Sequence, residues 1–332
     1  LDLSQSLKDL MYASFDMRTV WPPAERMPAG YDWKRIMELG KNPGLGVRQL
    51  HAKGITGRGV GIGMIDARLL VDHQEYAERI RLYEENGLGR WLDRRAEMHG
   101  AATASIAVGK TVGVAPEADL YYIGAPVGGL FGSRDFTLYA KSVHRLLEIN
   151  KQLPPDRKIR VIAMQVGWSP TEAAYAEMKA AAAAAKDAGM LVISSSVEET
   201  HGFAFHGLGR DPLADPELAE SYRPGLWWEK MFYAGRMQEG CLLVPMDSRA
   251  TAGPGAKDDY AFYRAGGWSW SIPYIAGLYA LAVQVDPTIT PDRFWKTALQ
   301  TGRTIQIQHE GKEYSFGRIV DPPALIEAIG GR

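Results

Sequence analysis

Short apolar runs alternate with helix-like stretches through the middle of the chain. The apolar runs are rich in Val and Ile and bounded by glycine, proline or charge, a pattern that predicts strands. The predicted strands are Val60–Ile65, Ala118–Ile123, Lys158–Val166, Met190–Ser194 and Cys241–Pro245, and the predicted helices among them are His99–Val108, Phe136–Asn150 and Thr171–Ala188. Strands that alternate with helices indicate parallel pairing with helices on both faces. We therefore predict an α/β fold of three layers with a mostly parallel central sheet.

A long uncharged apolar run, Ile275–Val285, predicts a buried helix. It follows a turn in which Gly266 and Gly267 precede Ser269, so that one hydroxyl lies at the start of the helix. Free backbone N–H groups and the helix dipole favour developing negative charge at such a position. A serine that only caps a core helix fits the same local pattern, so the choice depends on the rest of the chain.

The two ends of the chain differ from the middle. Residues 1–45 lack clear periodicity apart from a short amphipathic helix expected within Leu3–Met17, and we predict an N-terminal arm or the remnant of a removed segment. Residues 46–332 are predicted to form the main domain, with a long irregular excursion at 199–240. The elements predicted at the C-terminal end are a helix after Thr290, a hairpin near Ile305–Tyr314 and a helix at Pro323–Ile329.

Composition limits the kind of protein. The 332 residues are 46% hydrophobic and 23% charged, which is typical of a globular protein with a sizeable core. A net charge of −1 gives no electrostatic reason to expect nucleic acid or an anionic membrane as a partner. No apolar run reaches the roughly 18 residues of a membrane span. Cys241 is the only cysteine, which excludes an internal disulfide and a thiolate metal cluster.

Two further expectations concern cofactors and location. No cofactor is predicted, because the glycine-rich stretch Gly54–Gly63 lacks the glycine that a dinucleotide fingerprint has three residues after its second one. The chain begins with Leu1 and shows no secretory signal, so we expect a processed or trimmed form. A secreted protein is favoured and an intracellular one is left open, as is the oligomeric state.

Three loops offer residues that act together in acyl transfer. Asp66 follows a predicted strand, whereas His99 and Ser269 each begin a predicted helix. A serine hydroxyl is a poor nucleophile until an imidazole removes its proton, and the imidazole needs an anion behind it to fix its tautomer and stabilise its positive charge. The chain order Asp, His, Ser is that of the subtilisin type of serine hydrolase and not of the chymotrypsin or α/β-hydrolase types.

The motifs around these residues resemble the subtilisin-like serine proteases, the subtilase family, over most of Asn42–Ile329. Gly54–Asp66 resembles the strand that ends in the family's aspartate. His99–Ala107, followed by Val112-Gly-Val-Ala-Pro116, resembles the family's histidine helix and its Gly-Val-Ala-Pro turn. Gly267–Gly277, with the sequence Gly-Trp-Ser-Trp-Ser-Ile-Pro-Tyr-Ile-Ala-Gly, resembles Gly-Thr-Ser-Met-Ala-Ser-Pro-His-Val-Ala-Gly.

The resemblance implies a subtilisin-like fold and a serine endopeptidase that acts on a peptide or protein. Ser269 is expected to be the nucleophile, His99 the general base and then acid, and Asp66 the orienting anion. No metal is predicted, because Val108–Val114 is much shorter than the loop that carries the strong calcium site in secreted subtilisins.

The oxyanion region departs from the family pattern. Where the family has an asparagine side chain that donates to the oxyanion, the alignment places Glu198, or Glu199 if it slips by one. Two outcomes are open: Glu198 is kept protonated by burial and donates, or it points away and the Ser269 backbone N–H acts with another donor such as Gln165. In the first case we expect a working enzyme with a lowered pH optimum.

The predicted substrate side is aromatic. Met164–Trp168 resembles the strand that lines the specificity pocket, so Val166, Gly167 and Trp168 are expected to contact substrate, with Trp168 filling or reshaping the pocket. Gly128 and Trp268 are assigned to the same role, and Trp270 fits either the site or the core equally well. These residues predict a selective protease. The alternative function is a catalytically weak or inactive subtilase-fold protein that binds or regulates a partner.

Overall fold

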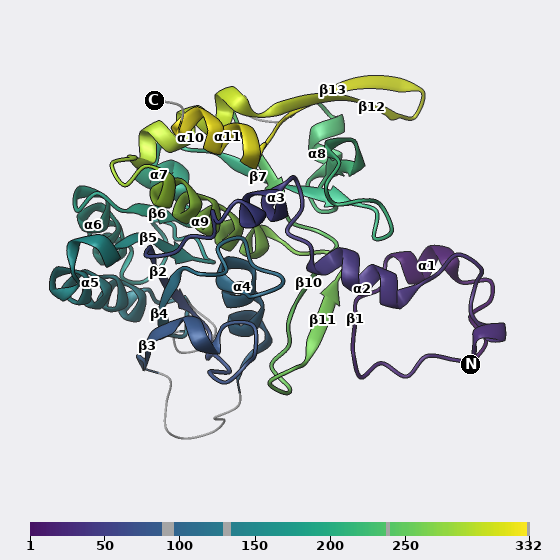
Figure 1. Ribbon diagram of the computed structural model, residues 1–332, viewed down its shortest axis with the longest axis horizontal. Coiled ribbons are helices and arrows are strands. Elements are labelled where there is room, and N and C mark those ends of the chain that lie inside the picture. The colour runs from purple at the N-terminus through teal and green to yellow at the C-terminus, as the bar shows by residue number, and fades with distance from the viewer. Residues whose placement is uncertain (88–95, 129–133, 237–239, 331–332) are drawn as a thin grey trace.

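The computed structural model describes residues 1–87, 96–128, 134–236 and 240–330 (Figure 1). Its centre is a five-stranded sheet in the order β3-β4-β2-β5-β6, and every neighbouring pair in it is parallel. The strands are β2 (Gly61–Asp66), β3 (Ile80–Glu85), β4 (Asp119–Gly124), β5 (Ile159–Met164) and β6 (Leu191–Ile193). The predicted parallel sheet is therefore confirmed, and the edge strand β3, which the sequence analysis did not predict, extends it.

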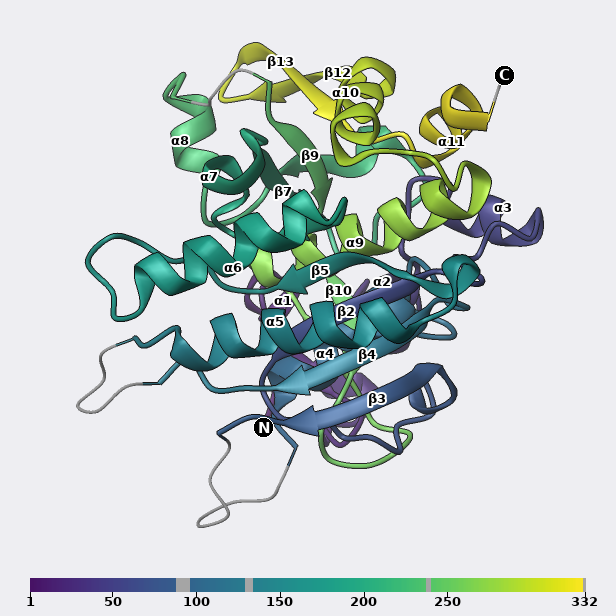
Figure 2. The same cartoon turned by 90° about the vertical axis from the view of Figure 1, so that its left-hand side faces the viewer.

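Helices cover both faces of this sheet, which confirms the three-layer α/β fold (Figure 2). The helices are α4 (Met98–Val108) and α9 (Trp268–Val285) on one face, and α5 (Thr137–Gln152) and α6 (Tyr175–Asp187) on the other. Side chains alternate along β2, since Ile62 and Met64 join the core of α4 and α9 whereas Ile65 joins that of α5 and α6. Gly63 faces α5, where an added Cβ would lie 2.9 Å from a Leu146 methyl group.

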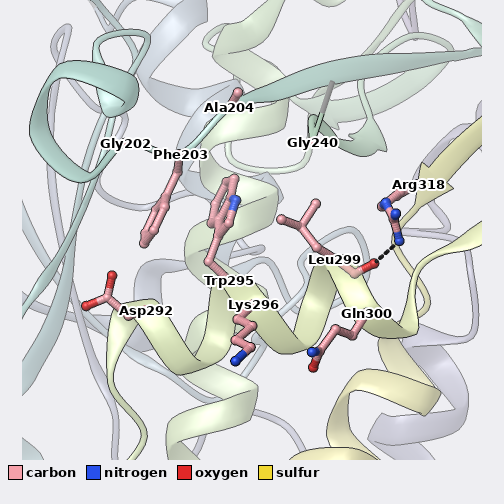
Figure 3. Close-up of a pocket in the computed structure, with 10 residues that line it drawn as sticks. All are labelled: Gly202, Phe203, Ala204, Gly240, Asp292, Trp295, Lys296, Leu299, Gln300 and Arg318. Atoms are coloured by element: carbon pink, nitrogen blue, oxygen red, sulfur yellow. Dashed lines mark hydrogen bonds between the residues drawn. The ribbon is translucent and has the colours of Figure 1, made fainter. Parts of the chain in front are cut away.

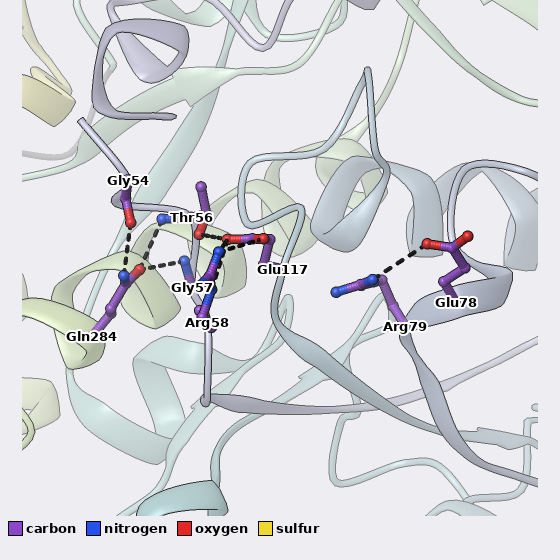
Figure 4. Close-up of polar contacts among 8 residues, drawn as sticks. All are labelled: Gly54, Thr56, Gly57, Arg58, Glu78, Arg79, Glu117 and Gln284. Atoms are coloured by element: carbon purple, nitrogen blue, oxygen red, sulfur yellow. Dashed lines mark hydrogen bonds and ion pairs between the residues drawn. The ribbon is translucent and has the colours of Figure 1, made fainter. Parts of the chain in front are cut away.

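The central helix α9 is buried over almost its whole length, as its apolar sequence predicts. A Cβ on Gly277 would lie 2.6 Å from the Val114 Cβ, so glycine allows α9 to pack closely against the segment after α4. Near the other end, the Gln284 amide oxygen accepts the Thr56 and Gly57 N–H groups at 2.8 and 2.7 Å (Figure 4). This contact fixes the end of α9 to the loop that leads into β2.

A second sheet has the order β12-β13-β9-β7-β8 and combines parallel and antiparallel pairs. Its strands are β7 (Phe205–Arg210), β8 (Tyr222–Pro224), β9 (Leu242–Pro245), β12 (Arg303–His309) and β13 (Lys312–Ile319). The neighbouring helices are α7 (Val197–His201), α8 (Glu229–Tyr233), α10 (Pro291–Thr301) and α11 (Pro322–Gly330). The described residues of the stretch 199–240 include β7, β8 and α8, and the expected C-terminal helices and hairpin are present.

The N-terminal segment packs on a third, antiparallel sheet, β1-β11-β10. The N-terminal segment contains α1 (Leu7–Met11), β1 (Phe15–Asp16), α2 (Trp33–Lys41) and α3 (Val47–Ala52). The other two strands of the sheet are β10 (Arg249–Ala252) and β11 (Tyr260–Tyr263). The expected helix within Leu3–Met17 is shorter than predicted, because Phe15 leaves it to pair with Phe262 and pack against Trp21 and Trp33. The start of the chain is therefore attached to the strand that leads toward Ser269.

Candidate active site

Asp66 is the last residue of β2, at the carboxyl edge of the parallel sheet. The residue is only 4% exposed. Its Oδ1 accepts the Ala67 backbone N–H at 2.7 Å, and its Oδ2 accepts the Thr103 hydroxyl, also at 2.7 Å. These two donors fix the orientation of the carboxylate.

His99 lies in the first turn of α4, opposite Asp66. Its Nδ1–H donates to Asp66 Oδ1 at 2.7 Å, so Nε2 remains for contact with a substrate or nucleophile. A Cβ on Gly100 would lie 2.7 Å from the Ala67 carbonyl oxygen, so glycine allows α4 to approach the end of β2 this closely. Burial lowers the pKa of His99, but the hydrogen bond and charge of Asp66, together with Glu97, outweigh burial and raise it above 6.5.

Ser269 lies in the first turn of α9, after the N-cap Gly267, whose φ of +83° favours glycine. Its hydroxyl donates to the Gln165 carbonyl oxygen at 3.4 Å and not to His99. The next residue, Trp270, contacts the His99 ring edge to face, with the ring centroids 5.8 Å apart. The serine turn and the Asp66–His99 pair thus lie at the same edge of the sheet.

The two residues assigned to the oxyanion region lie in different environments. Gln165 directly follows β5 and is only 8% exposed, and its side-chain amide nitrogen and oxygen have no hydrogen-bond partner within the described residues. Glu198 is exposed on α7, whereas one of the two sequence alternatives required it to be buried. Glu199 points to α6, where it accepts from the Tyr175 hydroxyl and pairs with Lys179 at 3.1 Å.

The residues assigned to substrate binding are dispersed. The Val166 carbonyl accepts the Ser195 N–H, and the Gly167 carbonyl accepts from Arg134. Trp168 is buried, and its ring packs on Phe136 within the core of α5 and α6. Gly128 is exposed after β4, next to residues 129–133, which lie outside the described residues.

Trp268 is partly buried and belongs to an aromatic group beside Ser269, whereas Trp270 is a core residue. His206 stacks on Trp228 at 4.5 Å and contacts Trp268 at 5.5 Å. Trp227 lies over Trp268 at 5.8 Å and is 62% exposed. Neither His206 nor Trp227 was expected at the site from the sequence, where the signal for them was the adjacent pair of tryptophans, Trp227 and Trp228.

A small pocket of about 80 Å³ lies between Glu198 and Trp268. Phe203 and Ala204 form part of its wall and also border a larger cavity of about 650 Å³ beside α10 (Figure 3). No group of three or more His, Cys, Asp or Glu side chains in residues 1–87, 96–128, 134–236 and 240–330 is arranged to hold a metal ion. In that same part of the chain, no helix combines the length and apolar character needed to cross a bilayer.

A parallel α/β sheet that carries an Asp–His pair at its carboxyl edge, next to a serine that begins a buried helix, defines a subtilisin-type serine hydrolase fold. The model of the peptidase S8 family, described as "Subtilase family", matches residues 57–234, which are more than half of the chain. The chain therefore belongs to the subtilase family of serine proteases. The matched range includes Asp66 and His99 and ends before Ser269.

Individual proteins agree with this assignment. The subtilisin-like protease PopC of Myxococcus xanthus (strain DK1622) is 38% identical over 85 residues, which are 23% of this chain and 18% of PopC. The chain thus matches less than a fifth of the length of that relative. A solved structure of the PatG macrocyclase in complex with peptide has a TM-score of 0.57 and 14% identity, and the alignment covers 87% of this chain and 97% of that one. This likeness concerns the fold alone.

Proposed function

We propose that this protein is a serine endopeptidase that cleaves peptide bonds through an acyl-enzyme. The observation that carries the proposal is the 2.7 Å hydrogen bond between His99 Nδ1 and Asp66, whose carboxylate is fixed by Thr103 and the Ala67 N–H. This bond leaves Nε2 of the imidazole to act as the base. Ser269, at the N-terminus of α9, is the nucleophile.

The reaction follows from these groups. The Ser269 hydroxyl turns from the Gln165 carbonyl to His99, which takes its proton as Oγ attacks the substrate carbonyl carbon. The Ser269 backbone N–H and the Gln165 side-chain amide donate to the oxyanion. His99 then returns the proton to the leaving amine as the C–N bond breaks. Water, activated by His99, hydrolyses the ester and restores the hydroxyl.

Gln165 is the preferred oxyanion donor because its buried amide has no partner within the described residues. A buried amide without a hydrogen bond costs about 1–3 kcal/mol, a cost that a bound transition state removes. Glu198 is exposed on α7, so the burial that its donation would require is absent. We therefore propose the second of the two sequence alternatives.

The aromatic group beside Ser269 supports a selective enzyme. Trp268 and Trp227 restrict the space next to the nucleophile, and the pocket between Trp268 and Glu198 has a volume of only about 80 Å³. We expect cleavage of few bonds in an unfolded protein. Rapid digestion of casein at many unrelated bonds would contradict this selectivity.

Labelling by a fluorophosphonate probe tests the catalytic assignment. Wild-type protein is expected to label and Ser269→Ala is expected not to label. Ser271→Ala is the matched control, because it removes a buried hydroxyl two residues further along the same helix and is expected to keep labelling. Digestion and tandem mass spectrometry locate the adduct on the Ser269 peptide.

The second candidate is a subtilase-fold protein that binds a peptide without turnover. It is favoured by the Ser269 hydroxyl bonding to Gln165 and not to His99, and by the carboxylate of Glu198 near the site. Absence of labelling in folded wild-type protein from acid to alkaline pH would favour this alternative. Because PatG is a macrocyclase, products are analysed for cyclic as well as linear peptides.

A further inference from the structure

Asp247 is a buried carboxylate in the turn between β9 and β10, and it is only 1% exposed. Both of its oxygens accept backbone N–H groups from other segments of the chain. Gly266 donates to Oδ1 at 2.9 Å, and Leu226 donates to Oδ2 at 2.8 Å. A buried carboxylate is costly unless it is well hydrogen-bonded, so these two donors explain how the fold tolerates it.

The first donor belongs to the nucleophile turn, because Gly266 precedes Ser269 by three residues. This turn lies directly against the Asp247 segment, since the Ser248 N–H donates to the Arg264 carbonyl at 3.1 Å. A Cβ on Gly266 would lie 2.2 Å from the Met246 carbonyl oxygen, so no other residue fits without a shift of the backbone. The Asp247 segment therefore lies directly against the turn from which α9 and its serine begin.

The second donor belongs to the loop that carries the exposed tryptophan. Leu226 immediately precedes Trp227, whose ring lies over Trp268 at 5.8 Å with an interplanar angle of 31°. A Cβ on Gly267 would lie 3.5 Å from the Trp227 ring, so this ring also covers the N-cap of α9. One carboxylate thus joins the nucleophile turn to an exposed aromatic ring beside it.

We propose that Asp247 is a positioning residue that keeps the Ser269 turn and the Trp227 loop in fixed relation, so that Trp227 and Trp268 form a wall for the substrate residue next to the scissile bond. The proposal rests on the proposed protease function. Asp247 touches no substrate and acts only through the Gly266 and Leu226 N–H groups. An exposed tryptophan gains from burial against a substrate side chain, which is the chemistry such a wall would use.

The test compares Asp247→Ala and Asp247→Asn with Asp321→Asn. Asn retains one acceptor oxygen, whereas Ala retains none. Asp321 is a matched control, because it is also a buried carboxylate that accepts a backbone N–H, that of Ala324, at the start of α11. We expect Asp247→Ala to slow fluorophosphonate labelling about 10- to 100-fold, as a misplaced nucleophile does, and Asp247→Asn to fall between it and wild type. Asp321→Asn labels at the wild-type rate.

Two further measurements separate positioning from general destabilisation. Hydrogen exchange at the Gly266 and Leu226 amides is expected to accelerate in the Asp247 variants and not in Asp321→Asn. For a peptide substrate, Asp247→Ala raises KM as well as lowering kcat, and Trp227→Ala raises KM. In the double variant the two KM effects do not multiply, because both remove the same wall.

The outcomes are distinct from those of the protease assignment. If folded Asp247→Ala labels at the wild-type rate while the Gly266 and Leu226 amides exchange faster, the positioning role is wrong. If Asp247→Ala does not fold, the fluorophosphonate labelling rate of Asp247→Asn is used in its place. A rate below that of wild type supports the positioning role, and a rate equal to that of wild type contradicts it. If wild type itself does not label, the protease function is refuted. Independently of labelling, unchanged exchange of the Gly266 and Leu226 amides in Asp247→Asn would refute the role of Asp247 in holding the Ser269 turn and the Trp227 loop together.

Discussion

Replacing Asp66 by Asn tests the catalytic geometry most directly. In the wild type, Asp66 accepts three hydrogen bonds, from His99, Thr103 and the Ala67 N–H. Asn can keep its oxygen at the Oδ1 position, where it accepts the Ala67 N–H and the His99 Nδ1–H, with its NH2 group toward the Thr103 hydroxyl. The negative charge that stabilises the imidazolium during acylation is then lost. This loss is expected to lower the acylation rate by up to about 10⁴-fold.

The pH dependence of acylation tests the effect of Asp66→Asn on His99 in a second, independent way. Only neutral His99 acts as a base, and Asp66 raises the pKa of His99 above 6.5, so wild-type labelling rises with pH through a midpoint above 6.5. Without the carboxylate, the effect of burial dominates and lowers the pKa. The midpoint in Asp66→Asn is therefore expected below 6.5, on a rate profile that is low throughout.

Stability follows the same pKa shift with a definite sign. Because folding raises the pKa of His99, its contribution to wild-type stability is fully present below about pH 6.5 and is lost as the pH rises through the folded-state value. In Asp66→Asn, folding lowers that pKa, so the contribution of His99 falls as the pH decreases.

The assay is the second-order rate of fluorophosphonate labelling from pH 5 to 9, with melting temperatures measured in the same buffers. Asp66→Asn that labels within tenfold of wild type at pH 7.5, with an unchanged midpoint, would refute the assigned roles of Asp66 and His99.

Three other variants test separate parts of the structure. Gln165→Met removes the unpartnered amide at nearly constant side-chain shape, so it is expected to raise the free energy of unfolding in urea by about 1 kcal/mol. The same change is expected to slow labelling about 10²–10³-fold. A variant that labels at the wild-type rate would exclude Gln165 from the oxyanion site. Glu198→Asn is expected to leave the labelling rate and its pH profile unchanged, because Glu198 is exposed and Gln165 is the proposed donor, whereas a gain of up to about 10²-fold would show that residue 198 reaches the oxyanion. Gln284→Ala leaves the Thr56 and Gly57 N–H groups without their acceptor and is expected to cost about 1–3 kcal/mol of unfolding free energy, with no change in the labelling rate of the folded protein.

Much of the fold follows from periodicity alone. The apolar runs that become β2, β4, β5, β6 and β9 are visible in the sequence, because a strand buried on both faces needs few polar residues. The edge strand β3 was not predicted, since Ile80–Glu85 is half charged and lies at the border of the sheet. β7 was also not predicted, because His206, Gly207 and Gly209 interrupt its apolar pattern.

The candidate site, like the fold, can be predicted from the sequence only in part. Local sequence indicates that Asp66 ends a strand and that His99 and Ser269 begin helices, because these are properties of a few neighbouring residues. Whether the side chains meet depends on how the layers pack, and the contacts join residues 33 positions apart for Asp66 and His99 and 104 positions apart for Gln165 and Ser269.

The tryptophans show the limit of the sequence most clearly. Trp168, Trp268 and Trp270 have similar local sequences, yet Trp168 and Trp270 are core residues and Trp268 is partly exposed under Trp227. A hydrophobic side chain carries no local signal that distinguishes core from site, because burial depends on what the opposite segment supplies. The sequence by itself thus determined the order and local setting of the reactive residues. Only the tertiary structure decided which carboxylate, amide and aromatic ring surround them, because those neighbours come from distant segments brought together by packing.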